Sequence, residues 1–178
     1  MNVKKNRMAF VLWMTGLPCS GKTTLAKKLS DKVNNLAILD GDDLREWLSP
    51  KDFSRKGINE HNRKVANLAK LLVNHNVPVL VSLVSPFNEN REDAHKIIGD
   101  NMFIETYIKC SLSICEERDV KGMYKKARQN EIKDFIGVNT DYEIPDNPDL
   151  ILDTEKLNIE ESVNKLLLYL KNKNLIVN

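Results

Sequence analysis

The sequence predicts a three-layer α/β domain with a five-stranded parallel sheet and helices on both faces. Short apolar runs without polar alternation are typical of strands buried on both faces, as in parallel sheets. Longer helical patterns separate these runs, and strand–helix alternation implies right-handed crossovers. The five predicted strands are Phe10–Met14, Ala37–Leu39, Val79–Val84, Phe103–Ile108 and Leu150–Leu152.

The stretches between these strands carry helical patterns. In the third stretch, Val65, Leu68, Ala69 and Leu72 recur at i, i+3, i+4 and i+7, which predicts one apolar stripe facing the sheet. The predicted helices cover Lys22–Val33, Asp43–Leu48, Asn59–Asn74, Glu89–Ile98, Leu112–Glu117, Lys121–Asn130 and Ile159–Lys171.

Length and composition indicate one soluble domain over residues 1–178. Hydrophobic residues make up 42% of the chain and charged residues 29%, which is ordinary for a globular protein. The net charge of +2 argues against nucleic acid or a membrane surface as the partner. Three cysteines without metal-ligand spacing fit a reducing cytoplasm, and no apolar stretch approaches the ~20 residues that cross a bilayer.

A phosphate-binding loop follows the first predicted strand. Residues 16–23 read Gly-Leu-Pro-Cys-Ser-Gly-Lys-Thr and match G-x-x-x-x-G-K-[ST] between a strand and a helix, as that motif requires. Backbone N–H groups of such a loop wrap a phosphate chain, and the positive end of the next helix points at the same place. Lys22 can reach the β- and γ-phosphates, and the Thr23 hydroxyl can ligate Mg²⁺. The sequence therefore predicts a P-loop NTPase fold that takes ATP and Mg²⁺, with Gly16, Pro18, Cys19, Ser20, Gly21, Lys22, Thr23 and Thr24 at the nucleotide.

Two carboxylates follow the second predicted strand, in Leu39-Asp40-Gly41-Asp42-Asp43. The carboxyl ends of parallel strands face the crevice where ligands bind. One carboxylate can accept a proton from an attacking hydroxyl while the other orients a Mg²⁺-bound water or a ribose hydroxyl. This pattern predicts Asp40 and Asp42 as catalytic residues, with Asp40 also at the metal. Helix N-capping by Asp42 or Asp43 is the structural alternative.

The pattern favours a small-molecule kinase over two other classes of P-loop protein. The base-reading N-K-x-D of GTPases is absent from the sequence. The third predicted strand runs into Ser85-Pro86 and lacks the metal-holding acid of motor or remodelling ATPases.

A basic segment lies between the fourth and fifth predicted strands. Lys121, Lys125 and Arg128 are spaced by four and three residues, which predicts one cationic helix face. On a flap, such a face can close over anionic substrates and neutralise charge in a phosphoryl-transfer transition state. We therefore expect a helical lid over about residues 119–147, with a solvated surface helix as the alternative.

Together these residues resemble adenylylsulfate kinase, a family of P-loop kinases that phosphorylate the ribose 3′-hydroxyl of adenylylsulfate with MgATP. The resemblance runs from about Val11 to Thr154, nearly the whole chain. It is carried by Thr15-Gly16-Leu17 with the P-loop, Leu39-Asp40-Gly41-Asp42, Ser85-Pro86-Phe87, Cys115-Glu116-Glu117-Arg118-Asp119, Lys121–Arg128 and Leu152-Asp153-Thr154.

The resemblance implies roles for further residues. Arg45 would contact the anionic group of the acceptor, and Phe53 and Phe135 would sandwich its base. The implied catalytic residues are Lys22, Asp40, Asp42 and Ser85, and Thr23 and Asp40 would hold the metal. Besides the P-loop, ATP would contact Arg118, Arg128, Asp153 and Thr154. The acceptor would contact Asp42, Arg45, Phe53, Ile58, His61, Ser85, Pro86, Phe87, Lys121 and Phe135.

The acceptor half departs from the family pattern. Ile58 and His61 stand where the family has an arginine and an asparagine that touch the acceptor. Losing a charge-assisted donor costs ~1.5–3 kcal/mol unless Arg55, Lys56 or Arg63 compensates. A second departure reads Phe135-Ile136-Gly137-Val138-Asn139 in place of Phe-Thr-Gly-Ile-Asp.

These departures leave an alternative acceptor open, cytidine diphosphoramidate, which keeps a ribose, a two-phosphorus link and a stackable base. His61 would then read the pyrimidine, unless it is an exposed helix residue, and Ile58 would be a packing residue. A nucleotide-binding regulator without turnover is disfavoured because Lys22, Thr23 and both aspartates are present. The expected partner is a small-molecule nucleotide acceptor, and a homodimer stays open.

Overall fold

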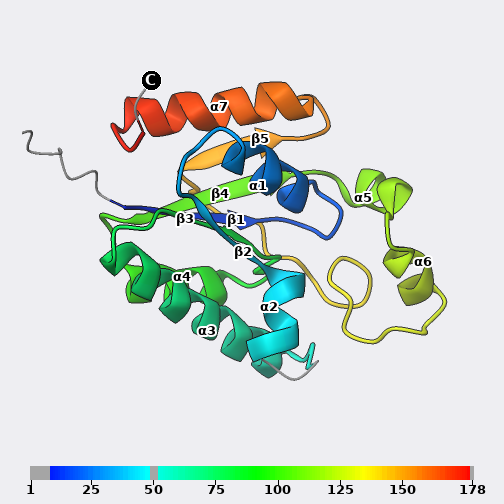
Figure 1. The fold of residues 1–178 in the computed structure, drawn as a ribbon. Helices are drawn as coiled ribbons and strands as arrows, with labels where there is room; N and C mark the ends of the chain where they lie inside the picture. The colour runs from blue at the N-terminus through cyan, green and yellow to red at the C-terminus, as the bar shows by residue number, and fades with distance from the viewer. Residues whose placement is uncertain (1–8, 49–51, 177–178) are drawn as a thin grey trace, which may run out of the picture.

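A five-stranded, all-parallel sheet forms the centre of the protein (Figure 1). The computed structural model describes residues 9–48 and 52–176. The strands lie in the order β2-β3-β1-β4-β5. Their bounds are Val11–Thr15 (β1), Ala37–Asp40 (β2), Val79–Ser82 (β3), Phe103–Lys109 (β4) and Leu150–Asp153 (β5). The sheet confirms the predicted fold class.

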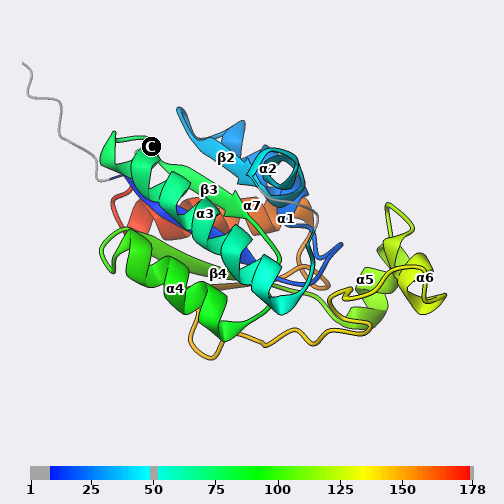
Figure 2. The same ribbon diagram turned by 90° about the horizontal axis from the view of Figure 1, so that it is seen from below.

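Helices cover both faces of this sheet, as Figures 1 and 2 show. One face carries α1 and α7, the other α2, α3 and α4, and α5 and α6 project beyond one end of the sheet. The helices in the described residues are Lys22–Ser30 (α1), Gly41–Leu48 (α2), Arg55–Asn74 (α3), Asn88–Ile98 (α4), Leu112–Arg118 (α5), Met123–Arg128 (α6) and Ile159–Asn172 (α7).

Strand β1 shows why the apolar runs do not alternate with polar residues. Val11 and Trp13 belong to the apolar cluster beneath α3 and α4, whereas Leu12 and Met14 belong to the cluster beneath α1 and α7. Both faces of β1 are therefore covered, and all five of its residues are buried. The predicted stripe on α3 is present, since Val65 and Ala69 are fully buried in the first cluster.

Several element ends differ from the sequence-based expectation, among them those of α3, α1 and β3. Helix α3 begins four residues early because the Ser54 side chain accepts a hydrogen bond from the Gly57 N–H, which caps the helix. Helix α1 ends at Ser30, three residues early. Strand β3 ends at Ser82, two residues early, and the chain then turns toward α4.

The predicted helix over Lys121–Asn130 is shorter in the structure, and its cationic face is a correction. Helix α6 begins after Gly122, whose φ of 66° is left-handed, so Lys121 lies outside the helix. The Asp119 carboxylate accepts hydrogen bonds from the Tyr124 and Lys125 N–H groups and fixes this start. Lys121 and Arg128 therefore do not share one helix face. Within residues 9–48 and 52–176, no helix is both long enough and apolar enough to cross a membrane.

Candidate nucleotide site at the carboxyl ends of the strands

The P-loop joins β1 to α1 at the carboxyl end of the central strand. Gly16 is required there because a Cβ at this position would lie 2.5 Å from the Ile108 carbonyl oxygen of β4. Gly21, with φ 104°, precedes the first turn of α1, and the N–H groups of that turn have no partner within the helix and face the loop. Cys19 is a non-glycine residue with a left-handed φ of 62° in the same loop. The loop conformation is thus fixed by the sheet on one side and by α1 on the other.

The Lys22 ammonium lies inside the loop. Its Nζ donates hydrogen bonds to the Gly16 and Leu17 carbonyl oxygens, each at 2.8 Å, and to the Ser20 hydroxyl at 3.3 Å. Burial lowers the pKa of Lys22 to about 8, although the nearby Cys115, Cys19 and aspartate groups oppose this shift. A buried cation held among carbonyl oxygens is a ready partner for a phosphate anion.

An acidic and hydroxyl cluster lies beside the P-loop at the end of β2. The Thr23 hydroxyl donates to Asp40 Oδ2 at 2.8 Å, and the Asp42 N–H donates to Asp40 Oδ1 at 3.1 Å. Asp40, rather than Asp42 or Asp43, therefore satisfies an N–H group of the first turn of α2, which differs from the structural alternative of capping by Asp42 or Asp43. The Asp42 carboxylate accepts a hydrogen bond from Lys121 Nζ at 2.5 Å. The structure thus brings together Lys22, Thr23, Asp40, Asp42 and Lys121.

The donor set at this cluster fits Mg²⁺. Mg²⁺ prefers oxygen ligands and is often bound by one or two protein oxygens plus substrate phosphates and water. The Thr23 hydroxyl and the Asp40 carboxylate are such oxygens, and they lie within hydrogen-bond distance of each other. In the described part of the chain, no group of three or more His, Cys, Asp or Glu residues could hold a metal alone. A metal here would need ligands from a phosphate chain.

Predicted ATP-side residues from α5 and β5 meet at the back of the P-loop. Arg118 donates to the Thr154 carbonyl oxygen at 2.8 Å and to the Cys19 carbonyl oxygen at 3.4 Å. The Thr154 hydroxyl donates to the Ser20 carbonyl oxygen at 2.9 Å. Asp153 forms an ion pair with Lys109, 3.4 Å apart.

Arg128 and Lys121 make different contacts, although the sequence placed them on one face. Arg128 pairs with Glu116 of α5, whereas Lys121 pairs with Asp42 of α2. Of these two pairs, that of Lys121 joins the predicted lid segment to the acidic cluster. The side chains of Lys121 and Arg128 are both more than half exposed.

The predicted acceptor residues include a buried apolar group and two aromatic rings that contact different partners. Ile58 is buried with Phe87 and Ile136, and Leu17 of the P-loop packs against this apolar cluster. The guanidinium of Arg45 lies 4.5 Å from the centre of the exposed Phe53 ring. Phe135 instead packs edge-on against Tyr124, with ring centres 4.9 Å apart.

His61 is fully buried, so its interpretation as an exposed helix residue is wrong. Burial, with smaller contributions from the Arg45 and Lys64 charges, lowers its pKa to about 4. The imidazole is therefore neutral at pH 7.

Two of the three cations considered as replacements for the missing family arginine, Arg55 and Arg63, differ in position, and the third, Lys56, is exposed. The Arg55 guanidinium lies 4.0 Å from the centre of the Phe87 ring and pairs with Glu89 at 2.7 Å. Arg63 pairs with Asp93 of α4. Arg55 is thus the one of these two that contacts a predicted acceptor residue.

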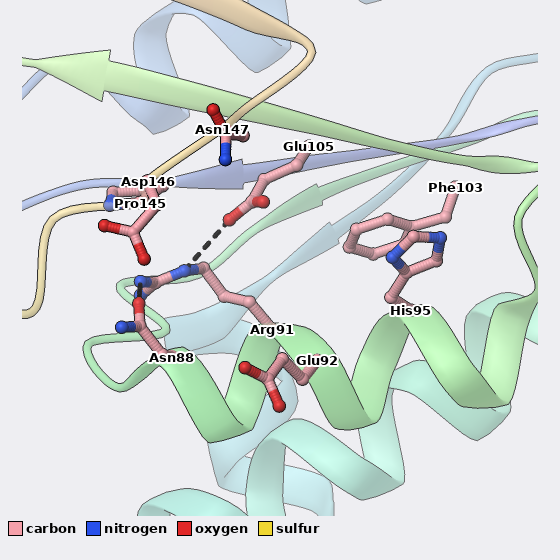
Figure 3. A pocket seen from close by; sticks show the side chains of 9 residues that line it. All are labelled: Asn88, Arg91, Glu92, His95, Phe103, Glu105, Pro145, Asp146 and Asn147. Atoms are coloured by element: carbon pink, nitrogen blue, oxygen red, sulfur yellow. Dashed lines mark hydrogen bonds and ion pairs between the residues drawn. The ribbon is translucent and has the colours of Figure 1, made fainter.

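The turn after β3 holds Ser85 and the buried Pro86. Side chains that belong to no predicted motif hold this turn in place. Ser85 accepts a hydrogen bond from Trp13 Nε1 at 3.0 Å and donates to Asn62 Oδ1 at 2.6 Å through its hydroxyl. Arg91 donates to the Ser85 carbonyl oxygen at 2.7 Å and pairs with Glu105 at 2.9 Å, and both residues line a pocket of about 190 Å³ (Figure 3). A polar residue on the apolar stripe of α3, Asn62, was the available signal.

The comparisons with known proteins agree on one family. The family model described as adenylylsulphate kinase matches residues 8–153. The chain is 43% identical over 173 residues to a probable adenylyl-sulfate kinase of Halalkalibacterium halodurans, covering 94% of this chain and 86% of the relative. It is 40% identical to the adenylyl-sulfate kinase of Staphylococcus epidermidis, covering 94% and 87%.

Solved structures are similar over the same length. The Mycobacterium tuberculosis APS kinase CysC, in complex with AMPPNP and APS, superposes with a TM-score of 0.85 at 36% identity. The match covers 92% of this chain and 98% of that one. These similarities give the cytidine diphosphoramidate alternative no support. The chain, with its P-loop and acidic cluster, belongs to the adenylylsulphate kinase family.

Proposed function

We propose that the protein transfers the γ-phosphoryl group of MgATP to the ribose 3′-hydroxyl of adenylylsulfate, giving 3′-phosphoadenylylsulfate and ADP. The observation that carries this proposal is the continuous cluster from the P-loop through Thr23 and Asp40 to Asp42 and Lys121. It supplies groups for both substrates within one chain of hydrogen bonds. Membership of the family supports the choice of substrate.

The donor half of the reaction uses the P-loop. Backbone N–H groups of residues 16–24, except Pro18, which has none, would hold the phosphates, and Lys22 would move from loop carbonyls to a phosphate oxygen. Arg118 and Thr154, which contact the loop from behind, are proposed to border the ATP base together with Arg128 and Asp153.

Thr23 and Asp40 would hold the Mg²⁺ that accompanies ATP, because both present oxygen donors at the end of the loop. When bound, the ion neutralises charge on the transferred phosphoryl group. The residues of the chain keep its ligands in place, since Asp40 is also tied to the N–H of Asp42.

In the acceptor half, Asp42 is proposed as the general base. Its carboxylate is 77% exposed, so a sugar hydroxyl can reach it. The 3′-oxygen forms a bond to the γ-phosphorus, the bond from that phosphorus to the β,γ-bridging oxygen breaks, and the hydroxyl proton passes to Asp42. Lys121 would leave Asp42 and face the anionic substrates. Arg45, Phe53, Phe135 and the wall formed by Ile58, Pro86 and Phe87 are proposed to hold the acceptor.

The test is an acceptor panel at fixed MgATP, read out as ADP release and product identity. Adenylylsulfate and cytidine diphosphoramidate are compared at equal concentration. We expect turnover with adenylylsulfate and at least about a tenfold preference for it. Preference for cytidine diphosphoramidate, or ATP binding without turnover of either compound, would refute the proposed acceptor or the proposed catalysis.

A cytoplasmic location and a small-molecule partner complete the proposal. Cys19, Cys110 and Cys115 are all free thiols, which fits a reducing compartment. A homodimer remains a prediction, to be tested by light scattering on the purified protein.

A further inference from the structure

Ser85, at the turn after β3, has a backbone conformation that L-residues rarely adopt. Its φ of 42° lies in the left-handed region, where a non-glycine residue is strained. The surrounding structure must hold such a residue in place. Arg91 donates to the Ser85 carbonyl oxygen at 2.7 Å, and the Thr15 hydroxyl, which lies 2.7 Å from the Val84 carbonyl oxygen, is 3.2 Å from that of Ser85.

The Ser85 side chain is held from the core. It is 1% exposed, and its hydroxyl bonds to the side chains of Trp13 and Asn62, which are 0% and 4% exposed. The hydroxyl therefore faces the interior, where it both accepts and donates a hydrogen bond. This placement differs from the expectation that Ser85 contacts the acceptor directly.

Asn62 is the connection between this turn and α3. Its Oδ1 accepts from the Ser85 hydroxyl at 2.6 Å, and its Nδ2 donates to the Ile58 carbonyl oxygen at 2.9 Å. Ile58 and Phe87 pack together in the apolar cluster that borders the P-loop. One buried amide thus fixes two segments that meet in this cluster.

The position of Asn62 on its helix makes this role unusual. Asn62 and His61 are the two polar side chains among the buried residues of α3, which are Gly57, Ile58, His61, Asn62, Val65, Ala66, Ala69 and Val73. A buried amide is costly unless it is hydrogen-bonded, and both ends of this one are.

We propose that Asn62 is a positioning residue that acts through Ser85 to hold the turn of residues 85–87 against α3, in the shape that the acceptor requires. The inference rests on the proposed function, because it assigns this turn to the acceptor side. It predicts that loss of the amide weakens acceptor binding and leaves ATP binding in place.

The central variant is Asn62→Leu, which keeps the approximate volume and removes both hydrogen bonds. We expect the KM for the acceptor to rise about tenfold, because an unsatisfied buried hydroxyl shifts the turn equilibrium by about that factor. The KM for ATP should stay within about twofold of wild type. Asn67→Leu is the matched control, because Asn67 Nδ2 also donates four residues back, to the Arg63 carbonyl oxygen at 2.8 Å, but on an exposed face.

Two further variants keep the test decisive. Asn62→Ala leaves room for a bridging water and should raise the acceptor KM about threefold even if Asn62→Leu does not fold. In the Asn62→Leu background, Ser85→Gly should lower the acceptor KM again, since glycine adopts φ 42° without an anchor. ATP-dependent thermal stabilisation reports whether each variant is folded.

Folded Asn62 variants with a wild-type acceptor KM, or with equal rises in both KM values, would overturn the proposal. So would a failure of Ser85→Gly to restore acceptor binding. These outcomes are separate from failure of the proposed function, which the acceptor panel on the wild-type protein decides first. The KM comparison then uses whichever acceptor the wild-type protein phosphorylates.

Discussion

Replacing Lys22 by methionine should strongly impair catalysis and also change how the stability of the protein depends on pH. Lys22 is 7% exposed, and burial holds the pKa of its ammonium group at about 8 instead of 10.5. Methionine has a similar length and no charge. Loss of the cation from the P-loop should lower kcat/KM about 10³-fold.

The effect on stability has a definite sign. Between pH 8 and 10.5 the unfolded chain still binds the Lys22 proton, whereas the folded chain has released it. The free energy of unfolding therefore rises with pH in this range. Between pH 7 and 9.5 the two pKa values, about 8 and 10.5, give a gain of about 2 kcal/mol that the variant lacks.

Urea unfolding of both proteins at pH 7 and pH 9.5 measures this difference. The fully buried Trp13 provides the fluorescence signal. Groups that titrate in both proteins cancel in the comparison, so the wild type should gain about 2 kcal/mol relative to Lys22→Met. Parallel pH dependences would refute the claim that the Lys22 cation is held at an energetic cost inside the loop.

Three other predictions follow from the site. ATP binding at pH 8.5 should take up roughly 0.7 proton, because a bound phosphate chain raises the pKa of Lys22. Calorimetry in buffers of different ionisation enthalpy measures this proton uptake, which Lys22→Met should lose. From pH 7 to 5 the wild type should lose about 2 kcal/mol of unfolding free energy relative to His61→Gln. The reason is that His61, with a pKa of about 4, stays neutral in the folded protein but is protonated in the unfolded chain. Equal losses in the two proteins would contradict this. Lys121→Met should raise the acceptor KM and shift the unfolding free energy by less than about 1 kcal/mol, since its pair with Asp42 is exposed, and Lys125→Met should leave the acceptor KM unchanged.

The order of strands and helices was predictable because each depends on local pattern. Runs such as Val79–Val84 predict strands buried on both faces, of which β3 takes Val79–Ser82, and the stripe through Val65 and Ala69 predicts a face toward a core. The ends were less predictable. The Ser54 cap extends α3, and Gly122 with Asp119 shortens the lid helix, since single hydrogen bonds decide where a helix starts.

The P-loop lysine and threonine and the aspartate pair were predicted from spacing alone, because phosphate and metal chemistry constrain consecutive residues. The Ser85 anchor was not. Trp13 and Ser85 are 72 residues apart, Asn62 and Ser85 are 23 apart, and no local pattern relates them.

The sequence by itself determined the layered sheet, the phosphate loop and the two carboxylates, because local periodicity and consecutive motif residues encode them. Only the tertiary structure decided that Lys121 pairs with Asp42, 79 residues away, and that Ser85 faces the core. The physical reason is that such contacts depend on how strands and helices from distant parts of the chain pack. That packing sets which side chains share a buried volume and which hydrogen bonds must then be satisfied.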